Sequence, residues 1–192
     1  MKLPRLWLDG IIRPLKMTAH LAVAPAPGVG FAAVLLRFVV TSLTSILSLY
    51  LLGRQPFVPS ELVMLPTERY YFAELFFLPF WGLAIWSLMG SFVYLTVRLS
   101  KGEADYGKIL NSIAVGMLVP MPFLWVWDWT AIALNIYTVT NQVVTHSIAQ
   151  LWEASIQAIC FVKVLRLNPA LAIVLAVLAN AMYIALAMHF IR

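Results

Sequence analysis

Ionisable side chains interrupt several long apolar stretches of this sequence, and they are the first candidates for chemistry because a charge inside a membrane is costly. Glu153 and Gln157 stand four residues apart, so a helix would place both on one face. Glu74, Asp128 and His146 are expected at the same end of the molecule as Glu153. If these groups converge, they would form an acidic site able to take a proton or a cation. The sequence leaves open whether they do.

Arg37 is the one charged residue of the first long apolar stretch, which runs from Val29 to Leu52. At 1.5 Å per residue, Arg37 would lie about 12 Å into a helix that starts at Val29. Its long side chain could reach back to the headgroups of the nearer leaflet, which is the interpretation that we favour. The alternative is an ion pair with an acid inside a helix bundle, which would place Arg37 in the same polar site.

The sequence contains no convincing pattern of a soluble enzyme. Residues 28–33 formally fit a dinucleotide-binding glycine motif, but no strand precedes them and an apolar span follows. His20, His146 and His189 lie far apart and lack the spacing of a metal site. Ser147 adjoins His146, and neighbours on a helix point in different directions, which is poor geometry for a nucleophile and its base. We therefore expect no enzyme, no cofactor and no bound metal.

Composition assigns the chain to a class. Of its 192 residues, 62% are hydrophobic and 11% are charged, and the mean hydropathy is +0.90. A soluble domain is about half apolar and about a quarter charged. Because so few charges could not cover the surface of a soluble particle, the sequence predicts an all-α integral membrane protein whose first partner is the lipid bilayer.

Uncharged runs of roughly 20 residues mark the membrane spans. They predict a single bundle of five transmembrane helices over residues 29–192, with spans at about 29–52, 71–99, 109–127, 147–165 and 169–191. Residues 1–28 mix apolar and basic side chains and are expected to lie on the cytoplasmic leaflet as a short interfacial segment. Residues 131–150 are semi-polar and predict either an interfacial helix or a polar segment buried against the bundle.

The basic residues indicate an orientation, since Lys and Arg are enriched in cytoplasmic connections. One side of the predicted topology carries nine of them: Lys2, Arg5, Arg13, Lys16, Arg98, Lys101, Lys108, Lys163 and Arg166. The other side carries three: Arg54, Arg69 and Arg192. We expect an inner (plasma) membrane protein with its N-terminus in the cytoplasm and its C-terminus outside. The net charge of +5 then reflects topology, and no nucleic-acid partner is expected.

Small residues at helical spacing predict close contacts between the spans. Gly82 and Gly90 would form one such face in the second span. Ala172, Ala176 and Asn180 would form another in the fifth, with Asn180 making a hydrogen bond to a neighbouring helix.

Several fragments resemble a known family. The run from Glu74 to Trp81, which contains Pro79, is similar to the Asp-Leu-Tyr-Gly-Pro-Phe-Trp motif of the Yip domain family, with Glu in place of Asp and one extra residue before the proline. The third span has Gly116 and Pro120 where family members place similar residues, although the family's Gly-Tyr pair reads Gly-Met here. The resemblance implies a five-span membrane protein of a family named for binding Ypt/Rab GTPases. Because fewer than 30 residues precede the first span, it implies a prokaryotic-type member.

The sequence thus supports three hypotheses on function. The first is a Yip-like protein that acts without catalysis by binding lipid, another membrane protein or further copies of itself. The second is a small proton- or ion-coupled transporter or channel that uses Glu153 with Glu74 and His146. The third is an accessory subunit of a larger membrane complex.

Overall fold

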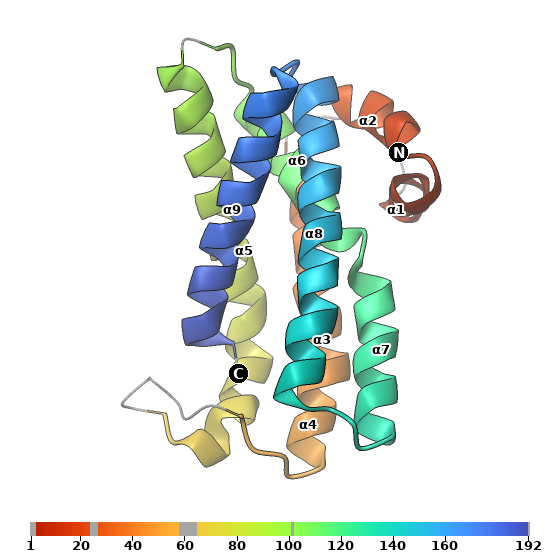
Figure 1. The fold of residues 1–192 in the computed structure, drawn as a ribbon. Helices are drawn as coiled ribbons and strands as arrows, with labels where there is room; N and C mark the ends of the chain where they lie inside the picture. The colour runs from red at the N-terminus through yellow and green to blue at the C-terminus, as the bar shows by residue number, and fades with distance from the viewer. Residues whose placement is uncertain (1–2, 24–26, 58–64, 101, 192) are drawn as a thin grey trace.

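A computed structural model describes residues 3–23, 27–57, 65–100 and 102–191 of the chain, and Figure 1 shows the arrangement of its helices. The long helices stand side by side as a bundle, and the described residues contain no strand. The helices are α1 (Leu3–Ile12), α2 (Pro14–Ala22), α3 (Gly28–Thr41), α4 (Leu47–Leu51), α5 (Tyr70–Leu99), α6 (Tyr106–Leu118), α7 (Met121–Ala133), α8 (Val139–Val164) and α9 (Pro169–Phe190). A π-helical turn, η1 (Ser42–Ile46), joins α3 to α4, and a 3-10 turn, η2 (Thr67–Arg69), precedes α5.

Four helical segments are long and apolar enough to cross a membrane. They are Gly28–Leu51, Thr67–Leu99, Tyr106–Ala133 and Pro169–Phe190. They match the first, second, third and fifth predicted spans, so a multi-pass helical membrane protein is the class that the structure supports. The fourth predicted span is α8, which is too polar to join this set although its 26 residues measure about 39 Å, more than a bilayer core of about 30 Å.

The semi-polar segment at residues 131–150 does not form a helix of its own. Residues 131–133 end α7, a turn follows, and the rest of the segment is the first half of α8. This half of α8 runs beside α7 in the bundle (Figure 1). Apolar side chains such as Val144 and Ile148 are exposed at the periphery, whereas Gln142 and His146 face a cavity between helices. The segment is therefore polar on its inner side and packed against the bundle.

The third predicted span is interrupted at its middle. Pro120 has no N–H to continue the helical ladder, and α6 ends two residues before it while α7 begins just after it. The indole nitrogen of Trp7 donates a hydrogen bond of 3.1 Å to the Val119 carbonyl at this break. The N-terminal segment thus supplies the partner that the broken helix requires.

Glycines allow the second span to pack closely, as their spacing suggests. A Cβ atom on Gly82 would come within 2.0 Å of the Phe38 ring, and one on Gly90 within 2.3 Å of Leu110. Pro79 lies inside α5, which nonetheless continues as one helix over its whole length. These contacts fix α5 against α3 and α6.

The N-terminal segment forms two helices that lie against the bundle near the end where α8 finishes (Figure 1). Leu6, Met17 and Leu21 are fully buried in a cluster with residues of α6 and α8. At the same end lie the helix termini that carry Arg98 and Lys163. The predicted counts also included Lys2, Lys101 and Arg192, which lie outside the described residues.

Candidate functional site

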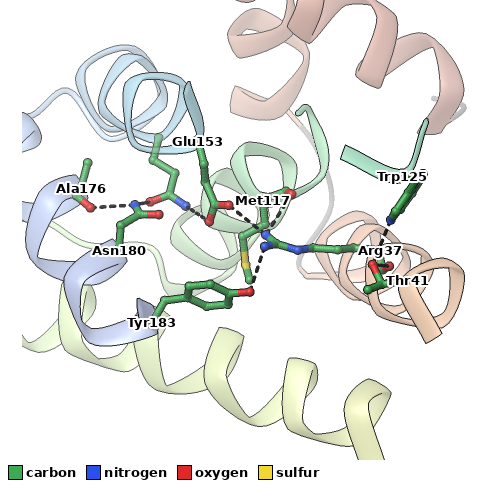
Figure 2. A network of polar contacts seen from close by, with 9 residues as sticks. Arg37, Thr41, Met117, Trp125, Glu153, Ala176, Asn180 and Tyr183 are labelled. Carbon is green, nitrogen blue, oxygen red and sulfur yellow. Dashed lines mark hydrogen bonds and ion pairs between the residues drawn. The ribbon is translucent and has the colours of Figure 1, made fainter. Parts of the chain in front are cut away.

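Arg37 is at the centre of a buried polar network (Figure 2). Its side chain is almost fully buried, and its Nη1 donates hydrogen bonds of 2.9 Å to Glu153 Oε2 and of 2.9 Å to the Met117 carbonyl. Its Nη2 donates a third, of 3.1 Å, to the Tyr183 hydroxyl. Arg37 therefore does not reach back to the headgroups, which was the interpretation that we favoured from sequence. It pairs with an acid inside the bundle.

The network continues from α8 to α9. Gln157 donates a hydrogen bond of 3.2 Å to Glu153 Oε1, and its own carbonyl accepts one of 2.8 Å from Asn180 Nδ2. Asn180 also donates to the Ala176 carbonyl of its own helix at 2.8 Å. Because Glu153 and Gln157 have no exposed surface, water does not compete for these groups. The chain of contacts links α3, α8 and α9 across the middle of the bundle.

Small residues let these polar side chains approach one another. A Cβ atom on Gly116 would come within 2.5 Å of Gln157 Cγ, so glycine leaves the room that this side chain occupies. Ala172 and Ala176 are buried on α9, two turns and one turn before Asn180, where α9 packs on α8. The small-residue face thus lies beside the network.

Aromatic rings enclose the Arg37 guanidinium. Its Cζ lies 5.1 Å from the ring centroids of both Phe38 and Tyr183, a distance at which a cation is attracted to a ring. Trp81 packs edge-on against the same two rings, at centroid distances of 5.8 Å and 5.5 Å. Gly82, the next residue, makes room for the Phe38 ring. Trp81, the last residue of the motif-like run, therefore supports the ion pair through the rings.

This network is suited to holding helices together and poorly suited to binding a substrate. The charges of Arg37 and Glu153 compensate each other at 2.9 Å, and both Nη atoms and both carboxylate oxygens of the pair are hydrogen-bonded. A buried pair with these partners favours one packing arrangement. We therefore assign the network a positioning role.

Glu74 and His146, the other two residues of the predicted acidic site, lie outside the network. Glu74 is fully buried on α5, where its carboxylate is within electrostatic reach of Tyr71 and Tyr137. His146 lies on the wall of a cavity that Glu74 and Glu153 do not line. No contact found among the described residues brings Glu74, His146 and Glu153 together.

A cavity between the helices lies beside His146. It measures about 350 Å³, is partly open, and lies between α3, α7, α8 and α9 with a mostly apolar lining. Asp128 lines it and is only 4% exposed. Ser45 donates a hydrogen bond of 2.9 Å to Asp128 Oδ2. Arg37 and Tyr183, which belong to the polar network, also line this cavity.

Sequence reasoning missed two members of the network. Tyr183 was not singled out, yet it stands three residues after Asn180, so both share a face of α9. The Met117 carbonyl carries no sequence signal, since every residue has one. The spacing to Asn180 is the signal that could have identified Tyr183.

Comparison of the chain with protein-family models, with curated proteins and with solved structures returned no match. The class of a multi-pass helical membrane protein accordingly rests on the sequence and the fold.

Proposed function

We propose that this protein crosses the inner membrane five times and acts by interaction with anionic lipid, without catalysing a reaction. The N-terminus would lie in the cytoplasm and the C-terminus outside. Helix α8 would be the fourth of these crossings, and its outer side exposes apolar residues that include Val144, Ile148 and Leu151. Membership of the prokaryotic Yip-type group is part of this proposal and rests on the motif-like residues Glu74, Pro79, Trp81, Gly116 and Pro120.

The outward face of α1 and α2 is the observation that supports lipid binding. It mixes exposed cations with exposed apolar side chains: Arg5, Arg13 and Lys16 with Leu8, Ile12 and Leu15. Such a mixture is typical of a helix whose apolar side chains enter the acyl layer while its cations reach the phosphates. The face thus fits the headgroup boundary of an anionic leaflet.

The arrangement of charges on α1 and α2 supports binding to an anionic leaflet. Asp9, the one acid of α1 and α2, is turned inward and lies 3.6 Å from Lys16 and 3.7 Å from His20. Among the described residues, no acid pairs with Arg5 or Arg13. These two arginines are therefore available to lipid phosphates.

The bundle holds this face in place. Trp7 is hydrogen-bonded to the break between α6 and α7, and Met17 and Leu21 are buried against the bundle. A surface that is already folded loses little conformational entropy when it binds. The lipid interaction is therefore expected to belong to the intact protein.

Native mass spectrometry of the detergent-solubilised protein tests the proposal, with phosphatidylglycerol and phosphatidylcholine as probes. The variant Arg5→Gln/Arg13→Gln should bind phosphatidylglycerol about 30-fold more weakly, since each cation contributes about 1 kcal/mol. The control Arg98→Gln/Lys163→Gln removes two exposed cations at the same end of the bundle and should have a much smaller effect. Equal losses in both variants, or no preference for the anionic lipid, would contradict the proposal.

A carrier or channel is the competing function, because His146 and Asp128 line a cavity. Glu153, which that hypothesis uses with Glu74 and His146, is closed off by Arg37 and Gln157 instead. Reconstituted protein should show no proton or ion flux above that of empty vesicles. A robust flux that Glu153→Gln abolishes would favour the carrier over our proposal. Co-purification of a stoichiometric membrane partner would favour an accessory subunit.

A further inference from the structure

We propose that the cavity between α3, α7, α8 and α9 binds an amphipathic amine, with its ammonium group at Asp128 and its hydrocarbon tail against the apolar walls. This site is separate from the lipid-binding face of α1 and α2. Its volume of about 350 Å³ falls in the range of small-molecule pockets, which begins at about 300 Å³.

Asp128 supplies an acceptor with no partner of its own. Its Oδ2 is held by Ser45, whereas its Oδ1 is buried and accepts no hydrogen bond from the residues that the structure describes. The Gln142 amide is close enough to interact with Asp128, yet its Nε2 also lacks a hydrogen-bond partner within the described part of the chain. A buried carboxylate oxygen in this state is costly, and either the nearby Gln142 amide or a donor that enters the cavity would lower that cost.

Further acceptors surround the same space. The Oε1 atom of Gln150, which lines the cavity, has no hydrogen-bond partner in the described residues. The Nδ1 atom of His146 lies 3.0 Å from the Gln142 carbonyl and can donate its proton there. In that tautomer the Nε2 atom of His146 is an acceptor. Together with Asp128 Oδ1, the residues that line the cavity then offer three acceptors, and an ammonium group has three N–H donors.

The charge of the cavity wall also selects a cation. Arg37 reaches this wall, but Glu153 compensates its charge. Burial and nearby carboxylates raise the pKa of Tyr137, on the loop before α8, well above its ordinary value, so its hydroxyl is neutral. Tyr183 from α9 accepts a hydrogen bond from Arg37. Among the described residues that line the cavity, Asp128 is the one acid, and its carboxylate supplies the charge that favours a cation.

The remaining walls are suited to a hydrocarbon chain. Leu124 and Trp125 of α7 and Ile184 of α9 contribute apolar surface. The Trp125 indole donates a hydrogen bond of 2.9 Å to the Thr41 hydroxyl, which fixes the orientation of its ring. An alkyl tail that leaves water for such walls gains about 0.8 kcal/mol per buried methylene.

Three probes of equal chain length test the charge preference: octylammonium, octanol and octanoate, each added to the purified protein in nanodiscs. Thermal unfolding reports binding, because a ligand of the folded state raises the midpoint. We expect stabilisation by octylammonium, with at least tenfold weaker binding of the other two. Equal binding of octanol would overturn the proposal and leave an apolar pocket only, and so would no binding of octylammonium.

Variants locate the site. Asp128→Asn keeps the shape and should weaken octylammonium binding at least tenfold, whereas Asp105→Asn, at an exposed helix start, should leave it unchanged. Ala187→Phe should fill the cavity and abolish binding. Unchanged affinity in both cavity variants would place the amine elsewhere and overturn the assignment. If Asp128→Asn does not fold, Ala187→Phe and the three probes on the wild type still test whether the cavity binds the amine.

The pH dependence gives a further readout. Protonation of Asp128 removes the carboxylate charge that would hold the ammonium group, so octylammonium binding should weaken as the pH falls. Binding that strengthens at low pH would contradict the proposal. The variant Arg5→Gln/Arg13→Gln should bind octylammonium like the wild type, so failure of the lipid proposal and failure of this one are distinguishable.

Discussion

Replacing Arg37 with methionine should destabilise the protein strongly. The substitution keeps a long apolar side chain but removes three hydrogen bonds, to Glu153, Met117 and Tyr183. It also leaves the Glu153 carboxylate without a counter-ion at a position with no exposed surface.

The expected magnitude follows from these contacts. Neutral hydrogen bonds between membrane helices contribute about 0.6 kcal/mol each, so three of them would account for only about 2 kcal/mol. Breaking a buried ion pair from one side costs about 3–5 kcal/mol, because the other charge stays behind. We therefore expect Arg37→Met to lower the free energy of unfolding by about 4 kcal/mol, and Glu153→Gln by about 3 kcal/mol.

A double variant separates the loss of hydrogen bonds from the cost of leaving one buried charge without its partner. Arg37→Met/Glu153→Gln removes both charges and should lose only about 1 kcal/mol, so the two substitutions should be strongly non-additive. Equilibrium unfolding in bicelles measures all three proteins, with Arg69→Met, an exposed arginine, as the control that should stay within about 0.5 kcal/mol of the wild type. Additive losses of about 2 kcal/mol or less would refute an ion pair that specifies the packing.

Two further predictions concern the packing of the bundle. Gly82→Ala should destabilise the protein by about 1–3 kcal/mol, because its Cβ would meet the Phe38 ring at 2.0 Å, whereas Gly28→Ala, where nothing lies within 4 Å, should be neutral or slightly stabilising in the same unfolding assay. Trp7→Phe keeps an aromatic ring but loses the hydrogen bond to the Val119 carbonyl, and should lower the free energy of unfolding by about 1 kcal/mol. Unchanged unfolding midpoints for Gly82→Ala or Trp7→Phe would contradict the respective contact.

The sequence predicts the coarse fold well, because apolar length is a direct signal of a membrane helix. Four apolar segments become four long helical segments close to the predicted limits. The break at Pro120 also has a local cause, since proline removes a backbone donor. The fourth span was predicted to begin at about residue 147, whereas α8 begins at Val139. Hydropathy does not register the local hydrogen bonds of the semi-polar residues, such as those of Thr145 and His146 to carbonyls of their own helix.

The contacts of the polar network can be predicted from the sequence only in part. Glu153 and Gln157 are recognisable as one face of a helix from their spacing alone. The partner of Arg37 is not, because residues 116 positions apart meet only after α3 and α8 have packed. The same limit applies to Asp128, whose burial depends on Ser45 from another helix and on α8 beside it. Spacing identifies neighbours on one helix, and tertiary contacts decide the rest.

The proposed five spans and the proposed orientation of the chain both require that α8 crosses the membrane. Single cysteines at Ile136 and Lys163, exposed before and at the end of α8, would be labelled from either side of sealed vesicles in a Cys160→Ala background. A membrane-impermeant reagent should label Ile136→Cys from the outside and Lys163→Cys from the cytoplasmic side. Labelling of both positions from the same side would contradict the proposed crossing.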